Sequence, residues 1–467
     1  MVFSGYSFLF VFLPAVLFVY YVLLRRRESR NVFLLLASLA FYAYGEPTFV
    51  LLLIASIAGN WLFALGIDRF RARAGTILVL ALGFNLAILF TFKYLTFTLR
   101  TFNALFGTDL PIPRILLPIG ISFFTFQAIS YVTDVYRSVK SGAPFSLAQK
   151  NPLRVGLYIA LFPQLVAGPI VRYSMFADQI LGRKETFARF SEGVSRFIFG
   201  LAKKVLLANN LALVADYAFG TDRLTVAAAW MGALAYTLQI YFDFSGYSDM
   251  AVGLGKMFGF TLPENFDYPY IARSASEFWR RWHISLGAWF RDYVYVPLGG
   301  SRVSSKVRLL FNLFVVWGLT GLWHGANLTF VAWGLMYFVL IALEKLTGFE
   351  KRLGPAAHLY LLFFVVLGWV FFRSNDLSHG VAFARTMFGL AGVPLWDPAA
   401  VFWFREHAVF FVFGLLFSLP VLPRFRESLG AMPGTAFFSA TVRGVLLLLS
   451  VAYLLGNSYA PFIYFNF

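Results

Sequence analysis

Apolar runs dominate this chain, and their lengths approach the roughly 20 residues that an α-helix needs to cross the hydrocarbon layer of a membrane. Examples are residues 8–24, 50–65, 77–92 and 309–322. Because 60% of the residues are hydrophobic and only 13% are charged, most side chains cannot face water. The sequence therefore predicts an all-α, polytopic integral membrane protein with roughly 11–12 transmembrane helices.

The net charge of +17 comes from Lys and Arg residues that gather in short loops between the apolar runs. Arg25, Arg26 and Arg27, for example, directly follow the first run. Such loops mark the cytoplasmic side of a membrane, whereas a nucleic-acid-binding surface would gather its basic residues on a soluble domain. We therefore interpret the charge as membrane topology, and we expect both termini to be extracytoplasmic. Nucleic acid is not an expected partner.

The absence of cysteine excludes disulfides, thiolate metal ligands and a cysteine nucleophile. The chain also has no HExxH motif, and its carboxylates are scattered, whereas a zinc site needs three or four ligands at suitable spacing. We therefore expect no metal centre.

Residues 1–467 are expected to form a single membrane-embedded domain. It would comprise N-terminal helices in residues 1–140, a catalytic core in residues 150–345, and C-terminal helices with an extracytoplasmic tail in residues 356–467. The division follows the apolar runs and the loops between them.

Two segments interrupt the pattern of spans, and both predict irregular structure inside the membrane region. Residues 153–171 are apolar but contain Pro163 and Pro169 between basic flanks, which favours a re-entrant segment. Residues 245–306 mix Gly, Pro, aromatic side chains and charges of both signs, so we expect short helices that line a cytoplasmic vestibule. Residues 373–407 are expected to be a polar loop.

His324 lies between Trp323 and Gly325. Near neutral pH an imidazole can take a proton from an attacking hydroxyl and return it to a leaving group, as acyl transfer requires. The small neighbour would give a substrate close access to the ring. The alternative is a buried histidine that is hydrogen-bonded across two helices. The desolvation cost of an ionisable group at membrane depth favours a functional role.

His283 follows a basic cluster. At helical spacing Arg280, His283 and Gly287 would share one face, and Glu277 could pair with Arg281. The arginines could bind an anionic donor such as a nucleotide phosphate, because guanidinium groups supply paired hydrogen-bond donors. A basic amphipathic helix at the lipid surface is an equally good interpretation.

Asp243 and Asp249 lie among hydroxyl-bearing side chains at the inner end of an apolar run. Buried polar groups often serve packing, so we interpret these carboxylates as structural groups that tie the irregular region together through hydrogen bonds. We interpret Glu264 and Asn265 in the same way.

The chain ends in the aromatic, uncharged sequence FIYFNF over residues 462–467. Such an end is typical of an anchor at the lipid interface. The hydroxyl of Tyr464 could instead accept an acyl group if the tail folded back into a cavity.

Taken together, these sequences resemble membrane-bound O-acyltransferases. They are most similar to the bacterial branch that includes alginate and peptidoglycan O-acetylases and the teichoic-acid D-alanylation protein. The resemblance covers nearly the whole chain. Its most specific segments are YFDFSGYSDM (241–250), ENFDYPY (264–270), EFWRRWHISL (277–286), RDYVY (291–295), LGGSR (298–302) and GLWHGAN (321–327).

This resemblance implies that His324 is the principal catalytic residue, with His283 supporting it, on a tunnel that crosses the membrane. It implies acetyl-CoA as a donor substrate that enters from the cytoplasm, with no bound cofactor. Residues near the basic cluster become candidates for binding the donor: Trp279, Arg280, Arg281, Arg291 and Asn327.

The resemblance also implies location and partners. The protein would lie in a bacterial inner membrane and pass the acetyl group, with Tyr464 as the candidate acceptor, to an extracytoplasmic esterase-like transferase that modifies an exported polysaccharide. Alginate is the favoured polysaccharide, with peptidoglycan or another exopolysaccharide as the alternative. A lipid or protein acyltransferase and a transporter are further alternatives; the missing inverted repeat argues against a transporter.

Overall fold

The computed structural model describes residues 1–142, 146–421, 435–456 and 462–463. These residues are mainly helical, and the only β-pairing among them is an isolated antiparallel bridge between Phe266 and Trp282. The prediction of an all-α protein is confirmed. Eight helices within the described residues are long and apolar enough to cross a membrane, and Ser7–Leu23 is a shorter apolar helix. The eight are Phe49–Arg69, Arg71–Phe106, Phe187–Gly220, Lys306–His324, Leu328–Thr347, Gly354–Arg373, Pro398–Phe417 and Phe437–Gly456.

Two compact units make up the chain. Unit 1 contains Met1–Val194 and Met250–Pro263, and unit 2 contains Ser195–Asp249 and Glu264–Phe467. Each unit is described by itself below.

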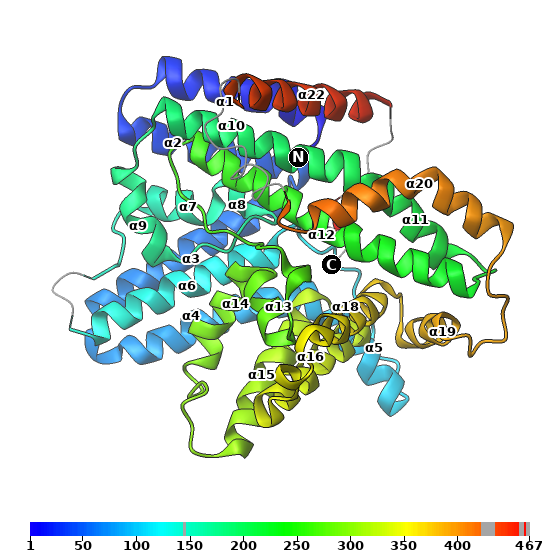
Figure 1. The fold of residues 1–467 in the computed structure, drawn as a ribbon. Helices are drawn as coiled ribbons and strands as arrows, with labels where there is room; N and C mark the ends of the chain where they lie inside the picture. Colours follow the sequence, from blue (N-terminus) through cyan, green and yellow to red (C-terminus); the bar gives the residue numbers. More distant parts are fainter. Residues whose placement is uncertain (143–145, 422–434, 457–461, 464–467) are drawn as a thin grey trace. The chain divides into compact units, whose positions relative to one another are not determined.

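The scaffold of unit 1 is a group of helices, of which α3, α4 and α6 lie side by side (Figure 1). Asn60 of α3 and Asn85 of α4 exchange side-chain hydrogen bonds of 2.7 and 3.1 Å, which pair two buried amides that would be costly to leave unsatisfied. The helices of unit 1 are α1 (Leu13–Phe18), α2 (Arg27–Gly45), α3 (Phe49–Arg69), α4 (Ala74–Leu89), α5 (Leu95–Phe106), α6 (Ile121–Lys140), α7 (Pro152–Ala160), α8 (Phe162–Leu165), α9 (Tyr173–Gly182) and the first part of α10 (Phe187–Ala202).

The predicted helix break in residues 153–171 is confirmed. Asn151 caps α7, which ends before Leu161, and the short helix α8 begins with Pro163 in its first turn. The side chains of residues 155–171 are buried in unit 1, and the hydroxyl of Tyr158 donates to the carbonyl oxygen of Val171 at 2.8 Å. Irregular backbone is tolerated in a membrane protein where protein surrounds it, as it does here.

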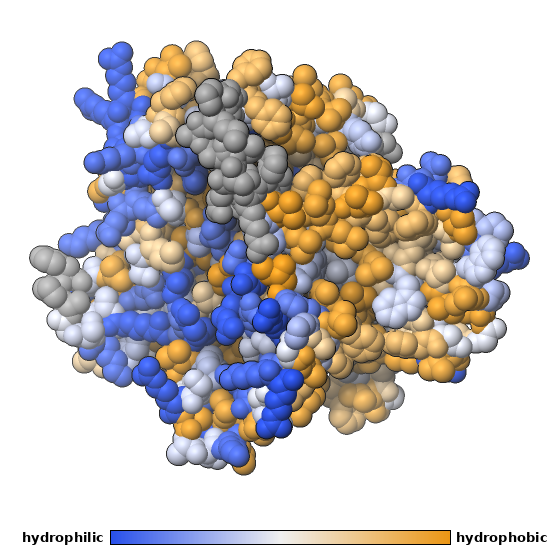
Figure 2. Space-filling view, in the orientation of Figure 1, coloured by the Kyte–Doolittle hydropathy of each residue, from blue (hydrophilic) through white to orange (hydrophobic). Residues whose placement is uncertain are grey.

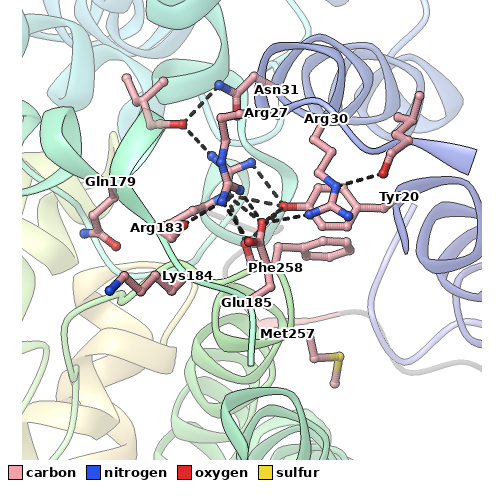
Figure 3. A network of polar contacts seen from close by, with 12 residues as sticks. Tyr20, Arg27, Arg30, Asn31, Gln179, Arg183, Lys184, Glu185, Met257 and Phe258 are labelled. Atoms are coloured by element: carbon pink, nitrogen blue, oxygen red, sulfur yellow. Dashed lines mark hydrogen bonds and ion pairs between the residues drawn. The ribbon is translucent and has the colours of Figure 1, made fainter. Parts of the chain in front are cut away.

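A network of charged side chains holds the end of the first apolar helix to the segment after α9 (Figure 3). The guanidinium group of Arg183 is fully buried and donates to Tyr20 Oη at 3.2 Å and to the Phe258 carbonyl at 3.1 Å. Arg27 donates to Glu185 Oε2 at 2.8 Å. Burial raises the pKa of Glu185, but the hydrogen bonds from Arg27 and Tyr20 outweigh it and lower the pKa to about 2.

Unit 2 is built around the antiparallel pair α15 and α16, with α13 and α18 packed against α16 (Figure 1). Residues 226–249 of α12 belong to this unit, and residues 250–257 belong to unit 1. Its helices include α11 (Asn209–Gly220), α12 (Val226–Met257), α13 (Ala275–Arg281), α14 (Ile284–Phe290), α15 (Lys306–His324), α16 (Leu328–Thr347), α17 (Phe349–Arg352), α18 (Ala357–Arg373), α19 (Leu377–Met387), α20 (Pro398–Phe417) and α22 (Thr435–Gly456).

The prediction of a polar loop over residues 373–407 is wrong. The segment contains α19 and the first half of α20. Asp376 caps α19 by accepting from the His379 N–H at 2.8 Å, and Asp397 caps α20 by accepting from the Ala400 N–H at 2.8 Å. These N-cap residues determine where the two helices begin, and a search for apolar runs alone does not find such starts.

The irregular region also begins later than predicted. Helix α12 continues through residue 245 to Met257, and the short helices α13 and α14 follow. The short helices themselves were expected.

Hydrophobic side chains gather on the surface over α20 and α22, as Figure 2 shows for one face of the molecule. Phe402 and Val412 of α20, and Phe437 and Leu448 of α22, are 60–79% exposed. Apolar surface of this extent suits contact with lipid rather than water.

Candidate active site

His324 is the last residue of α15, and it is buried among aromatic rings from three helices. Its ring centroid lies 4.9 Å from that of Trp323, 4.9 Å from that of Trp333 on α16 and 5.3 Å from that of Phe372 on α18. All three rings meet the imidazole edge to face. The walls next to His324 are therefore apolar and able to exclude water.

The two helices around His324 pack with their backbones almost in contact. A Cβ added to Gly334 of α16 would lie 2.5 Å from the Trp317 carbonyl oxygen and 3.1 Å from the Cα of Gly321. Both glycines are needed because any side chain would push α15 and α16 apart. This contact fixes the C-terminal end of α15, and with it the position of His324.

The space beside Gly325 is filled by protein. An added Cβ would lie 2.1 Å from the ring of Phe330. The expectation that this glycine gives a substrate close access to the His324 ring is therefore wrong: its missing side chain makes room for Phe330. The Phe330 ring therefore occupies the space that the sequence alone would assign to a substrate.

His283 joins α13 to α14 and is fully buried. Its backbone is left-handed, with φ of 45°, which is uncommon for a residue with a side chain. Helix α13 ends at Arg281, so the prediction that Arg280, His283 and Gly287 share a helical face is wrong. The imidazole is buried within unit 2, where its ring contacts those of Phe244 and Trp323.

Asn265 accepts hydrogen bonds from the donors of this turn. Its Oδ1 accepts from the Ser285 N–H at 3.2 Å and from the Ser285 hydroxyl at 2.6 Å, and its carbonyl accepts from the Ile284 N–H at 3.0 Å. The same Oδ1 lies 3.3 Å from His283 Nδ1, and Asn265 Nδ2 donates to Ser248 at 3.1 Å. The structural role predicted for Asn265 is confirmed, and its contact with His283 adds a role that the sequence did not indicate.

Burial lowers the pKa of His283 from 6.5 to about 3. The imidazole is therefore neutral at physiological pH, because charging it would require desolvating a cation. In the neutral ring one nitrogen donates a hydrogen bond and the other can accept a proton.

Trp323 connects the two histidines. Its ring centroid lies 5.7 Å from that of His283 and 4.9 Å from that of His324. The structure thus brings both predicted site residues into contact with one indole, although they lie 41 positions apart in the sequence.

A buried glutamate that the sequence analysis missed anchors α13. Glu344 of α16 accepts from the backbone N–H groups of Ala275 and Ser276 at 2.6 and 3.0 Å, at the positive end of the helix dipole. A lone acidic residue directly after the apolar run 328–343 is the signal that could have revealed it.

The candidate donor-binding residues occupy different surroundings. Arg281 pairs with Glu277 at 3.0 Å, as the spacing predicted, and with Asp267 at 2.8 Å. Arg291 pairs with Asp292 at 2.7 Å. Among the described residues, no carboxylate lies within ion-pairing distance of the exposed Arg280.

The two remaining candidates are held mainly by protein. Trp279 packs against Trp317, Trp333 and Tyr337 at centroid distances of 4.9–5.4 Å. Asn327 caps α16 through the Thr329 N–H and donates to the Asn375 carbonyl at 2.7 Å.

Carboxylates of α12 bind basic residues. Asp249 pairs with Arg196 and Lys203, each at 2.7 Å, and Arg196 also pairs with Glu264. The predicted structural role of Asp249 and Glu264 is confirmed, because these pairs join α12 to α10 and to the irregular segment. In the part of the chain that the structure describes, no group of three or more His, Asp or Glu could hold a metal ion.

Only two residues of the C-terminal sequence FIYFNF are described, and both are buried in unit 2. The Phe462 ring stacks on Tyr247 at 4.7 Å and lies 6.0 Å from Phe244, whose ring in turn lies 4.7 Å from His283. Tyr464, the candidate acyl acceptor, lies outside the described residues.

Comparisons with known proteins agree with the resemblance seen in the sequence. Residues 151–372, which contain both histidines, match the model of the membrane-bound O-acyltransferase family. The chain is 40% identical to the probable alginate O-acetylase AlgI of Pseudomonas putida over 100% of both chains. It is 44% identical to that of Pseudomonas aeruginosa, over 83% of this chain and 75% of the relative. It is also 36% identical to the peptidoglycan O-acetyltransferase of Helicobacter pylori, over 85% of this chain and 81% of the relative.

Proposed function

Because this chain belongs to the membrane-bound O-acyltransferase family, we propose that it moves acetyl groups from cytoplasmic acetyl-CoA across the inner membrane to hydroxyls of an exported polysaccharide. The observation that carries the proposal is the meeting of His283 and His324 at one buried indole. Two imidazoles inside an aromatic core suit proton transfer in a site that must exclude water.

His324 is the general base in this proposal. Its ring takes the proton of the acceptor hydroxyl while the oxygen attacks the thioester carbonyl. When the tetrahedral intermediate collapses, the C–S bond breaks and the same ring returns the proton to the leaving thiolate, so an ester and free CoA are formed. The surrounding Trp333 and Phe372 would keep water from competing with the acceptor.

His283 supports this step as a neutral partner. Burial lowers its pKa to about 3, so the ring stays uncharged while His324 cycles between its two protonation states. A neutral imidazole next to the same indole can accept a hydrogen bond from the acceptor or the donor without the cost of a second charge.

The donor would meet the protein at the exposed arginines. Arg280 has no carboxylate partner among the described residues, which leaves its guanidinium group available to a phosphate of CoA. Arg281 and Arg291 would contribute by releasing their carboxylate partners and binding the donor phosphates instead. Trp279 and Asn327 would line the route of the donor towards the catalytic histidine.

Transfer to the polysaccharide would take two steps. The acetyl group would first pass to a hydroxyl, for which Tyr464 is the candidate. An extracytoplasmic esterase-like partner would then move it to the polymer. Both termini would lie outside, as the distribution of Lys and Arg predicts.

Alginate is the favoured polymer, because relatives at 40–44% identity are described as probable alginate O-acetylases. Peptidoglycan is the second candidate, supported by the relative from Helicobacter pylori. The identity to that relative is lower, at 36%.

The decisive experiment is His324→Ala in a strain that makes the acetylated polymer. We expect acetylation to be lost while the amount of membrane-inserted protein stays normal. His407→Ala is the matched control, because this ring is only half-buried and stacks on Trp403 far along the chain on α20. Acetylation that persists in His324→Ala would contradict the proposed mechanism. Purified protein should consume acetyl-CoA, which a transporter would not.

A further inference from the structure

A buried ion pair between Asp243 of α12 and Lys204, which lies in the segment Lys203–Ala208 after α10, contacts the C-terminal tail. Asp243 is 1% exposed and pairs with Lys204 at 2.5 Å through Oδ1. Its other oxygen, Oδ2, accepts a hydrogen bond of 2.7 Å from the backbone N–H of Ile463. The two carboxylate oxygens are thus divided between a lysine of the core and the backbone of the tail.

Aromatic packing holds the same piece of tail. Phe462 is 3% exposed and stacks on Tyr247, one helical turn after Asp243 on α12. Phe244 lies between this ring and the active site, since it contacts both Phe462 and His283. The tail therefore reaches the wall of the histidine site through one intervening ring.

We propose that Asp243, paired with Lys204, is a docking site that captures the C-terminal tail by the backbone N–H of Ile463. A buried carboxylate is costly unless its oxygens are satisfied, and here the tail supplies one of the partners. Because the donor is a main-chain group, the site recognises the path of the backbone, while the rings of Tyr247 and Phe244 recognise an aromatic side chain at position 462.

This inference deepens the proposed function and rests on it for its purpose. Tyr464 follows Ile463 directly in the sequence. Docking of the preceding residues would hold the candidate acyl acceptor at the histidine site instead of leaving it to search a larger volume. Such pre-positioning contributes to the rate by lowering the entropy lost on the way to the transition state. Asp243 is a positioning residue in this scheme.

The test uses the fact that the chain has no cysteine. Ile463→Cys keeps the backbone donor and adds a single thiol, whose reaction with N-ethylmaleimide reports whether the tail is docked. We expect it to react at least about tenfold more slowly than the exposed control Ser304→Cys. Equal rates would mean that the tail is not held, and the proposal would fall.

The second experiment removes the proposed docking site. Asp243→Asn together with Lys204→Gln eliminates both charges at once, which avoids leaving a buried lysine unpaired. We expect labelling of Ile463→Cys to accelerate about tenfold or more, the effect of weakening a hydrogen bond to a charged group. Labelling of Ser304→Cys in the same background should not change, which checks the fold. Unchanged protection at position 463 would show that Asp243 is not the dock.

A backbone variant isolates the proposed hydrogen bond. Ile463→Pro removes the N–H while leaving Asp243 and Lys204 intact, and Ile463→Ala keeps it. We expect acetylation to fall about tenfold or more in Ile463→Pro relative to Ile463→Ala, and equal activities would contradict the proposal. Because labelling needs no catalysis, the two cysteine arms are repeated in His324→Ala. Protection that persists there supports the dock even if the acyl-transfer mechanism fails.

Discussion

Oδ1 of Asn265 lies 3.3 Å from Nδ1 of His283. The same oxygen accepts from the Ser285 N–H, so it is an acceptor and Nδ1 must carry the proton. Asn265 thereby assigns the tautomer of His283 and leaves Nε2 as the basic nitrogen. The sequence alone predicts only a structural role for Asn265.

Asn265→Asp should change the pH dependence of acetylation. A carboxylate next to Nδ1–H stabilises the imidazolium, so the acid limb of the pH–rate profile should move to higher pH. Asn265→Ala should lower the rate roughly tenfold to a hundredfold, since the buried hydrogen bonds of the turn are lost. Asn312→Ala, which removes another buried asparagine bonded to the Gly300 carbonyl, should leave the pH profile unmoved. An Asn265→Asp profile identical to the wild type would contradict the assignment.

Acid should destabilise the protein through His283. The unfolded chain binds a proton near pH 6.5, whereas the folded chain does so only near pH 3. Stability is therefore complete above pH 6.5 and falls as the pH drops towards 3. Between pH 6.5 and 4.5 we expect this residue to account for about 2 kcal/mol.

The measurement is thermal unfolding in detergent over this pH range. His283→Asn should lose less stability on acidification than the wild type, and His407→Asn should behave like the wild type. Glu185, whose pKa is lowered to about 2, changes the pH dependence of the stability only below about pH 4.5. Parallel curves for the wild type and His283→Asn would show that the ring is not buried in its neutral form.

Gly334→Ala should separate α15 from α16. The added Cβ meets the Trp317 carbonyl at 2.5 Å, and overpacking of this kind costs about 1–3 kcal/mol. Activity should fall as well, because His324 ends α15. Gly318→Ala on the facing helix α15 is the control: its Cβ meets nothing within 4 Å, so a small gain from helix propensity is expected. Equal melting temperatures for the two variants would contradict the close-packing argument.

Tyr464→Phe should abolish transfer to the polysaccharide while leaving the ring in place. Mass spectrometry of the C-terminal peptide should detect an acetyl adduct, about 42 Da heavier, in the wild type and none in the variant. Tyr453→Phe on α22 is the matched control. Full activity of Tyr464→Phe would remove Tyr464 from the relay and leave the role of His324 to be judged separately.

Much of the helical framework could be predicted, because a span must be both apolar and long enough, and few other structures meet that requirement. The runs 50–65 and 309–322 fall within α3 and α15, for instance. The start of α20 could not be found in this way, since it depends on Asp397 and not on hydrophobicity. Pairing of Glu277 with Arg281 could be predicted because it is local to one helix turn.

The site was predicted in part. Both histidines were identified by their chemistry, but their relationship depends on contacts between distant segments. The left-handed turn at His283 requires Asn265, which lies 18 positions earlier in the sequence, and no local pattern indicates a positive φ there. The crowding at Gly325 depends on Phe330, so spacing alone could not distinguish room for a substrate from room for a side chain.

The indole that touches both imidazoles has a consequence for how the site can vary over evolutionary time. A substitution at Trp323 alters the surroundings of His283 and His324 together, so neither can adapt while the other remains as it was. Tolerated changes should thus come as linked sets, and the separate effects of altering each histidine should not add. Selection then acts on the three rings as a single trait.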